Sequence, residues 1–313
     1  MIWLVIILFA IGIILIVKGG DYFVDASVWI AEALNVPKFL VGATIVSIAT
    51  TLPELLVSIF AALDKMPDMS VGNAVGSVTA NVGLIMSISI LALPGAVKRG
   101  EMAIKGFLML FTSVLLLLFS VGGYLSVTES VILLIIFVIY MADNVTEAKK
   151  IMGSARDNIN ISKKEICVNI FKFIVGITAI VLGAQLLVDN GSEIARLFGV
   201  PESIIAVTLV AVGTSLPEFV TTISAVIKKQ SALSVGNIIG ANIIDLTLIM
   251  PVCSLIYKGK IPISLQTITL DLPVCIGVIA VAVIPAVITG RFRRWQGIAM
   301  IAVYMAYIVK LCI

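Results

Sequence analysis

The sequence of 313 residues contains no histidine and few charged residues. Without imidazole groups, the chain can form neither histidine metal sites nor a histidine proton relay. Only 12% of its residues are charged, whereas 60% are hydrophobic, and no soluble globular core could bury so large an apolar share. The composition therefore excludes a soluble domain and predicts a polytopic protein of the lipid bilayer.

Cysteine is also scarce, and the excess of basic over acidic residues is small. The four cysteines lie in or beside apolar segments and form no CxxC pair, so we expect them to be small buried apolar side chains: Cys167, Cys253, Cys275 and Cys312. The net charge of +3 is too small to indicate a nucleic-acid partner. Neither feature suggests redox chemistry or nucleic-acid binding.

Long apolar segments, in contrast, follow one another along the whole chain. Each is long enough to cross a bilayer as a helix. They lie near 2–18, 39–63, 70–94, 103–120, 126–145, 166–188, 203–227, 231–256, 265–289 and 295–312. The sequence therefore predicts an all-α fold of ten transmembrane helices, five in each half of the chain.

The two halves are copies of one another. Residues 44–54 read TIVSIATTLPE and residues 208–218 read TLVAVGTSLPE, an offset of 164. The same offset relates Gly19 to Gly183 and Pro37 to Pro201. Because each copy has an odd number of spans, the second enters the membrane from the opposite side, which predicts inverted repeats. We expect repeats at 1–145 and 166–313, joined by a polar cytoplasmic linker at 146–165.

The basic residues set the expected orientation. With the N-terminus outside, 16 of the 21 basic residues fall in loops on the inner side. Lys65, Arg196, Lys258, Lys260 and Lys310 are the remainder. By the positive-inside rule, both termini are predicted to be extracytoplasmic, in a multi-pass protein of the cell membrane.

One acid stands deep in an apolar segment of each half. Glu54 and Glu218 each follow a proline, Pro53 or Pro217, which has no N–H to donate and frees a carbonyl four residues earlier. We therefore expect the second and seventh spans to be broken beside their acids. Irregular backbone and a carboxylate at membrane depth predict an oxygen-rich pocket on an ion pathway.

Hydroxyl groups accompany each acid at helical spacing. Thr50 and Thr214 precede the glutamates by four residues, and Thr51 and Ser215 are next to them. In the following spans, the pairs at the same spacing are Ser77 with Asn81 and Ala241 with Asp245. Such oxygens suit a hard cation such as Ca²⁺. One pocket that cannot hold two different loads at once is the physical basis of antiport.

At these residues the chain resembles the sodium/calcium exchangers of the cation/calcium antiporter superfamily. Their two motifs appear here as ATTLPE with GNAVGSVTAN in the first half and as GTSLPE with GNIIGANIID in the second. The resemblance covers the whole chain and is greatest to the compact prokaryotic members. It implies electrogenic exchange by alternating access, in which the first and sixth spans slide against the other eight.

The resemblance also implies a set of ion ligands. Glu54 and Glu218 would be shared by calcium and sodium, and the other ligands would be Thr50, Thr214, Thr51, Ser215, Asn81, Asp245, Ser77 and the carbonyls of Ser47 and Ala211. Ala241 departs from the usual serine, which removes one hydroxyl and predicts a weakened sodium site. We expect neither enzyme activity nor a cofactor, since Ca²⁺ and Na⁺ bind as substrates. An oligomer is not required, since one chain carries the whole site.

Other interpretations stay open at this stage. The same fold could be driven by protons, with titrating glutamates, although hydroxyls and carbonyls favour Na⁺; potassium co-transport is another alternative. A cation channel is a different class, but channels typically repeat a pore across subunits. Asp25 and Asp189, which correspond across the halves, are interpreted as loop or helix-cap residues.

Overall fold

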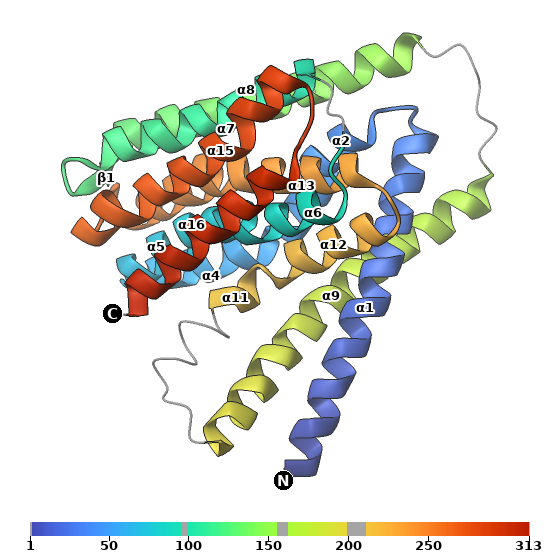
Figure 1. Cartoon of the computed structure of the whole chain (residues 1–313), viewed down its shortest axis with the longest axis horizontal. Helices are drawn as coiled ribbons and strands as arrows, with labels where there is room; N and C mark the ends of the chain where they lie inside the picture. The colour runs from blue at the N-terminus through green and yellow to red at the C-terminus, as the bar shows by residue number, and fades with distance from the viewer. Residues whose placement is uncertain (1, 96–98, 155–161, 199–210, 313) are drawn as a thin grey trace.

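The structure is a computed structural model that describes residues 2–95, 99–154, 162–198 and 211–312. In these ranges the chain is predominantly helical (Figure 1). Seven described helices are long and apolar enough to cross a membrane, and a bent pair of helices makes an eighth candidate span. Large hydrophobic side chains are exposed over much of the surface, as expected for helices that face lipid. The count of ten inverted spans stays a prediction.

The first half begins with one long helix and continues with interrupted ones. A single residue, Thr51, separates two helical runs that are bent by 44°. The elements are α1 (Ile2–Ala33), α2 (Lys38–Val41), the π-helical turn η1 (Gly42–Val46), α3 (Ser47–Thr50), α4 (Leu52–Leu63), α5 (Pro67–Ala80), the π-helical turn η2 (Asn81–Met86), α6 (Ser87–Ala92), α7 (Arg99–Ser120), β1 (Tyr124–Ser126) and α8 (Val127–Ser154).

The second half repeats the main helices of the first wherever it is described. These are α9 (Lys163–Leu197), α11 (Ala211–Thr214), α12 (Leu216–Ile227), α13 (Ser231–Ile244), the π-helical turn η4 (Asp245–Ile249), α14 (Met250–Ile256), β2 (Lys260–Pro262), the π-helical turn η5 (Thr267–Asp271), α15 (Leu272–Thr289) and α16 (Arg294–Cys312). Two short strands, β1 and β2, pair antiparallel, with Leu125 opposite Ile261.

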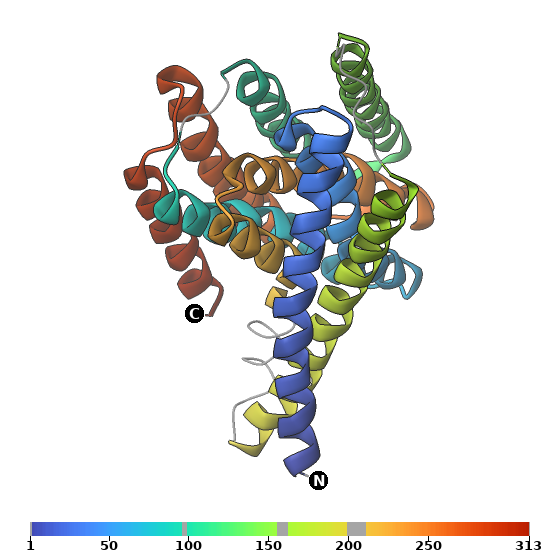
Figure 2. The same ribbon diagram turned by 90° about the vertical axis from the view of Figure 1, so that its right-hand side faces the viewer.

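Helices α1 and α9 form a pair that projects from the rest of the molecule (Figures 1 and 2). Glycines allow their close approach: a Cβ at Gly12 would lie 3.0 Å from the carbonyl oxygen of Gly183, and one at Gly19 would lie 2.8 Å from that of Gly176. The two contacts are related by the offset of 164. The same interaction is therefore made twice, once in each direction across the pair.

The buried core lies around two central spans, α5–α6 and α13–α14, each of which comes next in the chain after a broken helix. In the most apolar stretch of the α13–α14 span, 83% of the residues are buried, and the value for the α5–α6 span is 72%. The corresponding value is only 17% for both α8 and α9. Helices α7, α15 and α16 pack around this centre (Figure 1). The two central spans thus provide fixed walls, and peripheral helices contact them from outside.

Two expectations about the ends of helices are wrong. Helix α1 does not end near residue 18 but continues to Ala33, and Asp21 and Asp25 in this continuation pair with Lys228, the residue after α12. Asp25 and Asp189 are accordingly interior residues of α1 and α9 and neither loop nor cap residues. Helix α8 also continues to Ser154, and α9 begins at Lys163, so the described ends of the predicted linker are partly helical.

Several contacts join loops that the predicted orientation places on one side. Lys105 forms a 3.0 Å ion pair with Glu147, and the Phe292 N–H donates to the Gly95 carbonyl at 2.9 Å, all in segments predicted to be inside. On the predicted outer side, β1 pairs with β2. The contacts agree with the expected sidedness of the loops and leave the absolute orientation a prediction.

Candidate cation site

Each broken helix is interrupted at a hydroxyl residue one turn before its glutamate. Thr51 has φ −84° and ψ −2°, and Ser215 has φ −88° and ψ 6°. A proline follows in the first turn of α4 and of α12, where its missing N–H costs nothing. Glu54 and Glu218 consequently stand as buried side chains in the first turns of two helices, beside the breaks that the prolines predicted.

The helices that face the breaks carry a second shared irregularity. A π-helical turn begins at Asn81 in the first half and at Asp245 in the second. Such turns widen a helix by one residue and occur often at functional sites. No residue pattern predicts these π-helical turns, because a π-turn depends on how the helix packs. They begin at two residues predicted from sequence to be ligands.

Reciprocal hydrogen bonds join each broken helix to the central helix of the other half. Thr50 donates to the Asn237 side-chain oxygen at 3.2 Å, and Thr214 donates to that of Asn73, also at 3.2 Å. The offset of 164 converts one bond into the other. Asn73 also binds its own broken helix, since its amide donates to the Glu54 carbonyl at 3.1 Å. Asn73 and Asn237 thus each bind the broken helix of the other half, and Asn73 also binds that of its own half.

Three carboxylates from the two halves are buried together. Glu54 is 1% exposed, and Glu218 and Asp245 are 0% exposed. Glu54 is close enough to Glu218 and Asp245 for their charges to repel. Among the described residues, neither oxygen of Glu54 or Asp245 has a hydrogen-bond partner, nor does one oxygen of Glu218. Burying such a charge costs several kcal/mol unless it is paired or liganded, so the arrangement calls for a cation.

The remaining polar groups are arranged unevenly around the carboxylates. Thr51 donates to Glu218 at 3.3 Å, whereas Ser215, its counterpart, donates to Ser77 at 3.3 Å. Asn81 donates to the Asn242 side chain at 3.0 Å, and the Asn81 oxygen has no partner within the described structure. Asn242 was missed from the sequence, because its counterpart is an apolar valine and the repeat therefore offered no signal.

The structure thus brings most of the predicted ligand residues together. Glu54, Glu218, Asp245, Asn81, Thr50, Thr51, Thr214, Ser215 and Ser77 are linked by the contacts above. The Ser47 carbonyl accepts the N–H of Thr51 at 2.9 Å. Ala211 begins α11, directly after the undescribed residues 199–210. The ligand roles of all these residues, including the two carbonyls, stay predictions.

No three acidic or cysteine side chains in the described ranges form a metal-ligand group by themselves. The carboxylates would therefore need hydroxyl, amide and carbonyl oxygens to complete a coordination shell. Those oxygens are present beside them, and a mixed shell of this kind is what hard cations such as Ca²⁺ accept.

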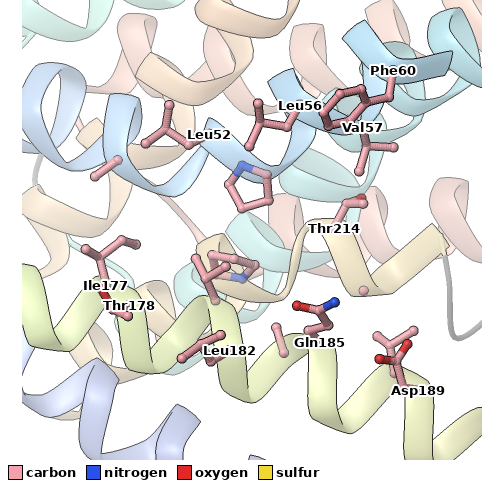
Figure 3. Close-up of a pocket in the computed structure, with 17 residues that line it drawn as sticks. Leu52, Leu56, Val57, Phe60, Ile177, Thr178, Leu182, Gln185, Asp189 and Thr214 are labelled. Carbon is pink, nitrogen blue, oxygen red and sulfur yellow. The ribbon is translucent and has the colours of Figure 1, made fainter.

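A cavity of about 630 Å³ lies beside this site, between α4, α9 and the break before α12. Pro53, Pro217 and Thr214 line its inner end. Figure 3 shows Leu56 and Phe60 of α4 on one side and Gln185 and Asp189 of α9 on the other. Most of its wall is apolar, with a few polar groups from α9 and α11. The cavity reaches both prolines that break the helices.

Known proteins share this architecture over almost their whole length. The sequence model for sodium/calcium exchanger proteins matches residues 4–144 and 168–312. Sodium/calcium exchanger MaX1 of Methanosarcina acetivorans is 31% identical, with 96% of each chain covered. The inner membrane protein YrbG of Escherichia coli is 31% identical over 81% of this chain and 80% of its own. The solved sodium-calcium exchanger NCX_Mj, soaked with Na⁺ and Sr²⁺, has a TM-score of 0.85, with 31% identity and 99% coverage of both chains.

Proposed function

The chain belongs to the sodium/calcium exchanger family, and we propose that it is a secondary antiporter that exchanges Na⁺ for Ca²⁺ at the site between its halves. The observation that carries the proposal is the cluster of buried carboxylate oxygens of Glu54, Glu218 and Asp245 without partners in the described structure. Two carboxylates balance one Ca²⁺, whereas three can balance several monovalent ions. Because Ca²⁺ and Na⁺ need the same oxygens, they cannot occupy the site at the same time.

We propose ten spans arranged as two inverted repeats of five, with alternating access between them. The reciprocal pairs support this arrangement, since Thr50–Asn237 and Thr214–Asn73 are the same contact under the offset of 164. So are the two glycine contacts between α1 and α9. Two equivalent halves around one site can exchange roles, which opens the site first to one side and then to the other.

The exchange is proposed to be electrogenic. A site with three carboxylates accommodates more monovalent charge than one Ca²⁺ supplies, so one exchange cycle moves net charge. The sliding unit is the α1–α9 pair, which projects from the remaining helices (Figure 2). Its contacts with the central helices are fewer than those that the central helices make with one another, as the low buried share of α9 indicates.

The expected setting is the cell membrane, with both termini outside. The distribution of basic residues supports this orientation, and the loops that it assigns to one side contact one another in the structure. Ca²⁺ and Na⁺ are substrates here rather than cofactors, and no enzyme activity is proposed. One chain holds a complete site, so transport does not require an oligomer.

Uptake of radioactive calcium into proteoliposomes tests the proposal. Vesicles loaded with Na⁺ should take up calcium when diluted into sodium-free buffer, with pH equal on both sides. Uptake should be faster when valinomycin and a potassium gradient make the lumen positive, because net positive charge leaves. Uptake that needs a pH gradient and ignores sodium would support the proton-driven alternative. Flux without any countertransported ion would indicate a channel.

The site assignment needs its own arm of the experiment. Glu54→Gln and Glu218→Gln keep the shape of the side chain and remove its charge, so both should abolish sodium-driven uptake. Asp143→Asn on α8 is the matched control, because that carboxylate is exposed and distant in sequence from both motifs. Normal uptake by both glutamine variants would exclude the proposed site.

A further inference from the structure

The end of α12 is fastened to α1 by one lysine. The Lys228 ammonium lies 2.6 Å from a carboxylate oxygen of Asp25 and 3.5 Å from one of Asp21, and it donates to the Asp21 carbonyl at 3.0 Å. We call this cluster of Lys228, Asp21 and Asp25 the α1–α12 clasp. It lies on the side of the membrane that the positive-inside rule assigns to the cytoplasm.

A close helix contact accompanies the clasp. Gly20 lies against α12 so tightly that a Cβ there would be 2.5 Å from the Ser224 hydroxyl and 2.9 Å from a methyl carbon of Val220. Ser224 is 8% exposed, as is Val220. On this side, α1 and the helix carrying Glu218 are therefore packed together, and the route between them is closed.

The internal repeat tells where the corresponding contact should be on the other side. The offset of 164 converts Gly20, Val220, Ser224, Lys228, Asp21 and Asp25 into Ala184, Leu56, Phe60, Asp64, Gln185 and Asp189. Five of these six residues are on α4 or α9 and line the cavity of about 630 Å³: Leu56, Phe60, Ala184, Gln185 and Asp189. Helices α1 and α12 thus touch on one side, whereas their counterparts, α9 and α4, are separated by a cavity on the other.

The charges differ in the same way. Asp64 stands in the position of Lys228, and Asp189 in the position of Asp25. Two acids cannot form an ion pair, so the outer counterpart of the clasp has no attraction to hold α9 against α4. The Lys228 side chain is 23% exposed and that of Asp25 is 54% exposed, so the clasp contributes a bias rather than a lock.

We propose that Lys228 is a positioning residue for transport, which holds the inner side closed through Asp21 and Asp25 and thereby makes the outward-open state the resting state. The inference rests on the proposed alternating access. It explains which side of the protein is open at rest by a difference in charge between the halves: an ion pair closes the inner side, and two acids stand at the corresponding place on the outer side. Sodium or calcium binding then changes an equilibrium between outward-open and inward-open states that the clasp has already shifted toward the outward-open state.

Distances between spin labels on each side test the clasp directly. One label pair, at Leu34 and Lys229, reports the inner contact, and another, at Lys65 and Phe198, reports the outer cavity. The four cysteines are first replaced by alanine, and sodium-driven uptake is confirmed in that background. Lys228→Gln and Asp25→Asn should each increase the population with a long inner distance by about two- to fivefold, the range for ion pairs of this exposure.

The outer pair should respond oppositely, with more of the short distance, because closing one side accompanies opening of the other. Asp143→Asn, at an exposed acid of α8 that belongs to neither the clasp nor its outer counterpart, is the matched control and should leave both distances unchanged. The exchange of charges in Lys228→Asp with Asp25→Lys should restore the native inner distance in part. A merely structural lysine would give no such reciprocal response and no rescue.

Unchanged distances in Lys228→Gln, together with normal uptake, would overturn the clasp and leave the exchange function intact. If the protein before the Lys228 substitution had no sodium-driven uptake, that result would instead overturn the proposed exchange function. A longer inner distance with no change on the outer side would also contradict the proposal, since it would show local loosening without a shift in access.

Discussion

The two halves of this chain keep the same skeleton and differ in the hydrogen bonds made on it. Both have a helix break, a proline and a buried glutamate, followed by a π-helical turn in the next span. Yet Glu218 accepts a hydrogen bond from Thr51, whereas both oxygens of Glu54 lack a partner in the described structure. Duplication has preserved the backbone geometry, and substitutions have made the two acids chemically different.

The difference begins at Ala241. Its counterpart, Ser77, receives the hydrogen bond of Ser215, which leaves Glu54 free. At the corresponding place in the other half, Thr51 meets no hydroxyl from Ala241 and donates to Glu218 instead. The hydroxyl that is absent at Ala241 thus accompanies a different hydrogen bond: Thr51 of the first half donates to the Glu218 carboxylate of the second half. We expect ion preference to depend on this asymmetry.

The largest effect should come from exchanging glutamate for glutamine in each half separately. Each variant loses one of the shared charges, and an interaction with a charged group is worth about 1.5–3 kcal/mol, so uptake should fall by at least tenfold in both. Glu54→Gln should be the more damaging, because both of its oxygens are available for a cation. Calcium binding by isothermal titration measures the two losses.

Equal losses of calcium affinity in Glu54→Gln and Glu218→Gln would show that the hydrogen bond from Thr51 has no influence on the ion. The double variant serves as the control, since two ligands of one ion should not contribute additively.

The second prediction concerns Asn81 and Asp245, which occupy corresponding positions and differ by one charge. Asp245→Asn gives both halves an amide and lowers the possible site charge from three to two. Because two charges still balance one Ca²⁺, the half-saturating sodium concentration should rise by about tenfold and that of calcium by much less. Sodium-dependent and calcium-dependent uptake curves measure the two effects. A larger loss for calcium than for sodium would contradict this account of charge.

Sequence reasoning reached the features that leave a chemical trace in one residue. Pro53 and Pro217 lack an amide hydrogen, so breaks beside Glu54 and Glu218 followed from their positions alone. The offset of 164 then identified which residues correspond, and the structure joins several of them across the halves. These features depend on local chemistry and on duplication, both of which are visible in the letters of the sequence.

Other features depend on tertiary contacts and left no such trace. Helix α1 continues past Lys18, and its Asp21 and Asp25 pair with Lys228, which is more than half the chain away and which no local pattern connects to them. Asn242 joins the site because it meets Asn81 across the interface, although no repeat partner indicated it. The π-helical turns likewise arise from packing between central helices, which no residue pattern specifies.

The third prediction restores the missing hydroxyl. Ala241→Ser places in the second half the group that Ser77 provides in the first. One additional hydrogen-bonding oxygen is worth about 1 kcal/mol, so the half-saturating sodium concentration should fall by about two- to fivefold. Flux measured over a sodium series tests this, with Ala286→Ser, at a buried alanine of α15 outside both motifs, as the control. An unchanged sodium dependence would show that Ala241 does not influence the sodium site.

The smallest expected effect concerns the two asparagines that bridge the halves. Asn73 accepts from Thr214 and donates to both the Glu54 carbonyl and the Ser58 hydroxyl, at 3.1 and 2.8 Å. Asn237 accepts from Thr50, and its amide has no partner within the described structure. Hydrogen bonds of this kind contribute about 0.5–1.5 kcal/mol each, so Asn73→Ala should destabilise the protein more than Asn237→Ala.

Thermal unfolding in detergent, without added cation and with saturating Ca²⁺, separates this structural contribution from ligand binding. The Asn73→Ala variant should unfold at the lower temperature in both conditions, because α4, the helix that carries Glu54 and Ser58, loses its anchor. If Asn237→Ala were the less stable of the two, the second amide would have a partner in solution, and the asymmetry between the halves would be smaller than the hydrogen bonds indicate. Equal stabilities would place the difference between the halves in Ala241 and Asp245 alone, since these two positions change the polar groups beside the buried glutamates without changing what holds the broken helices.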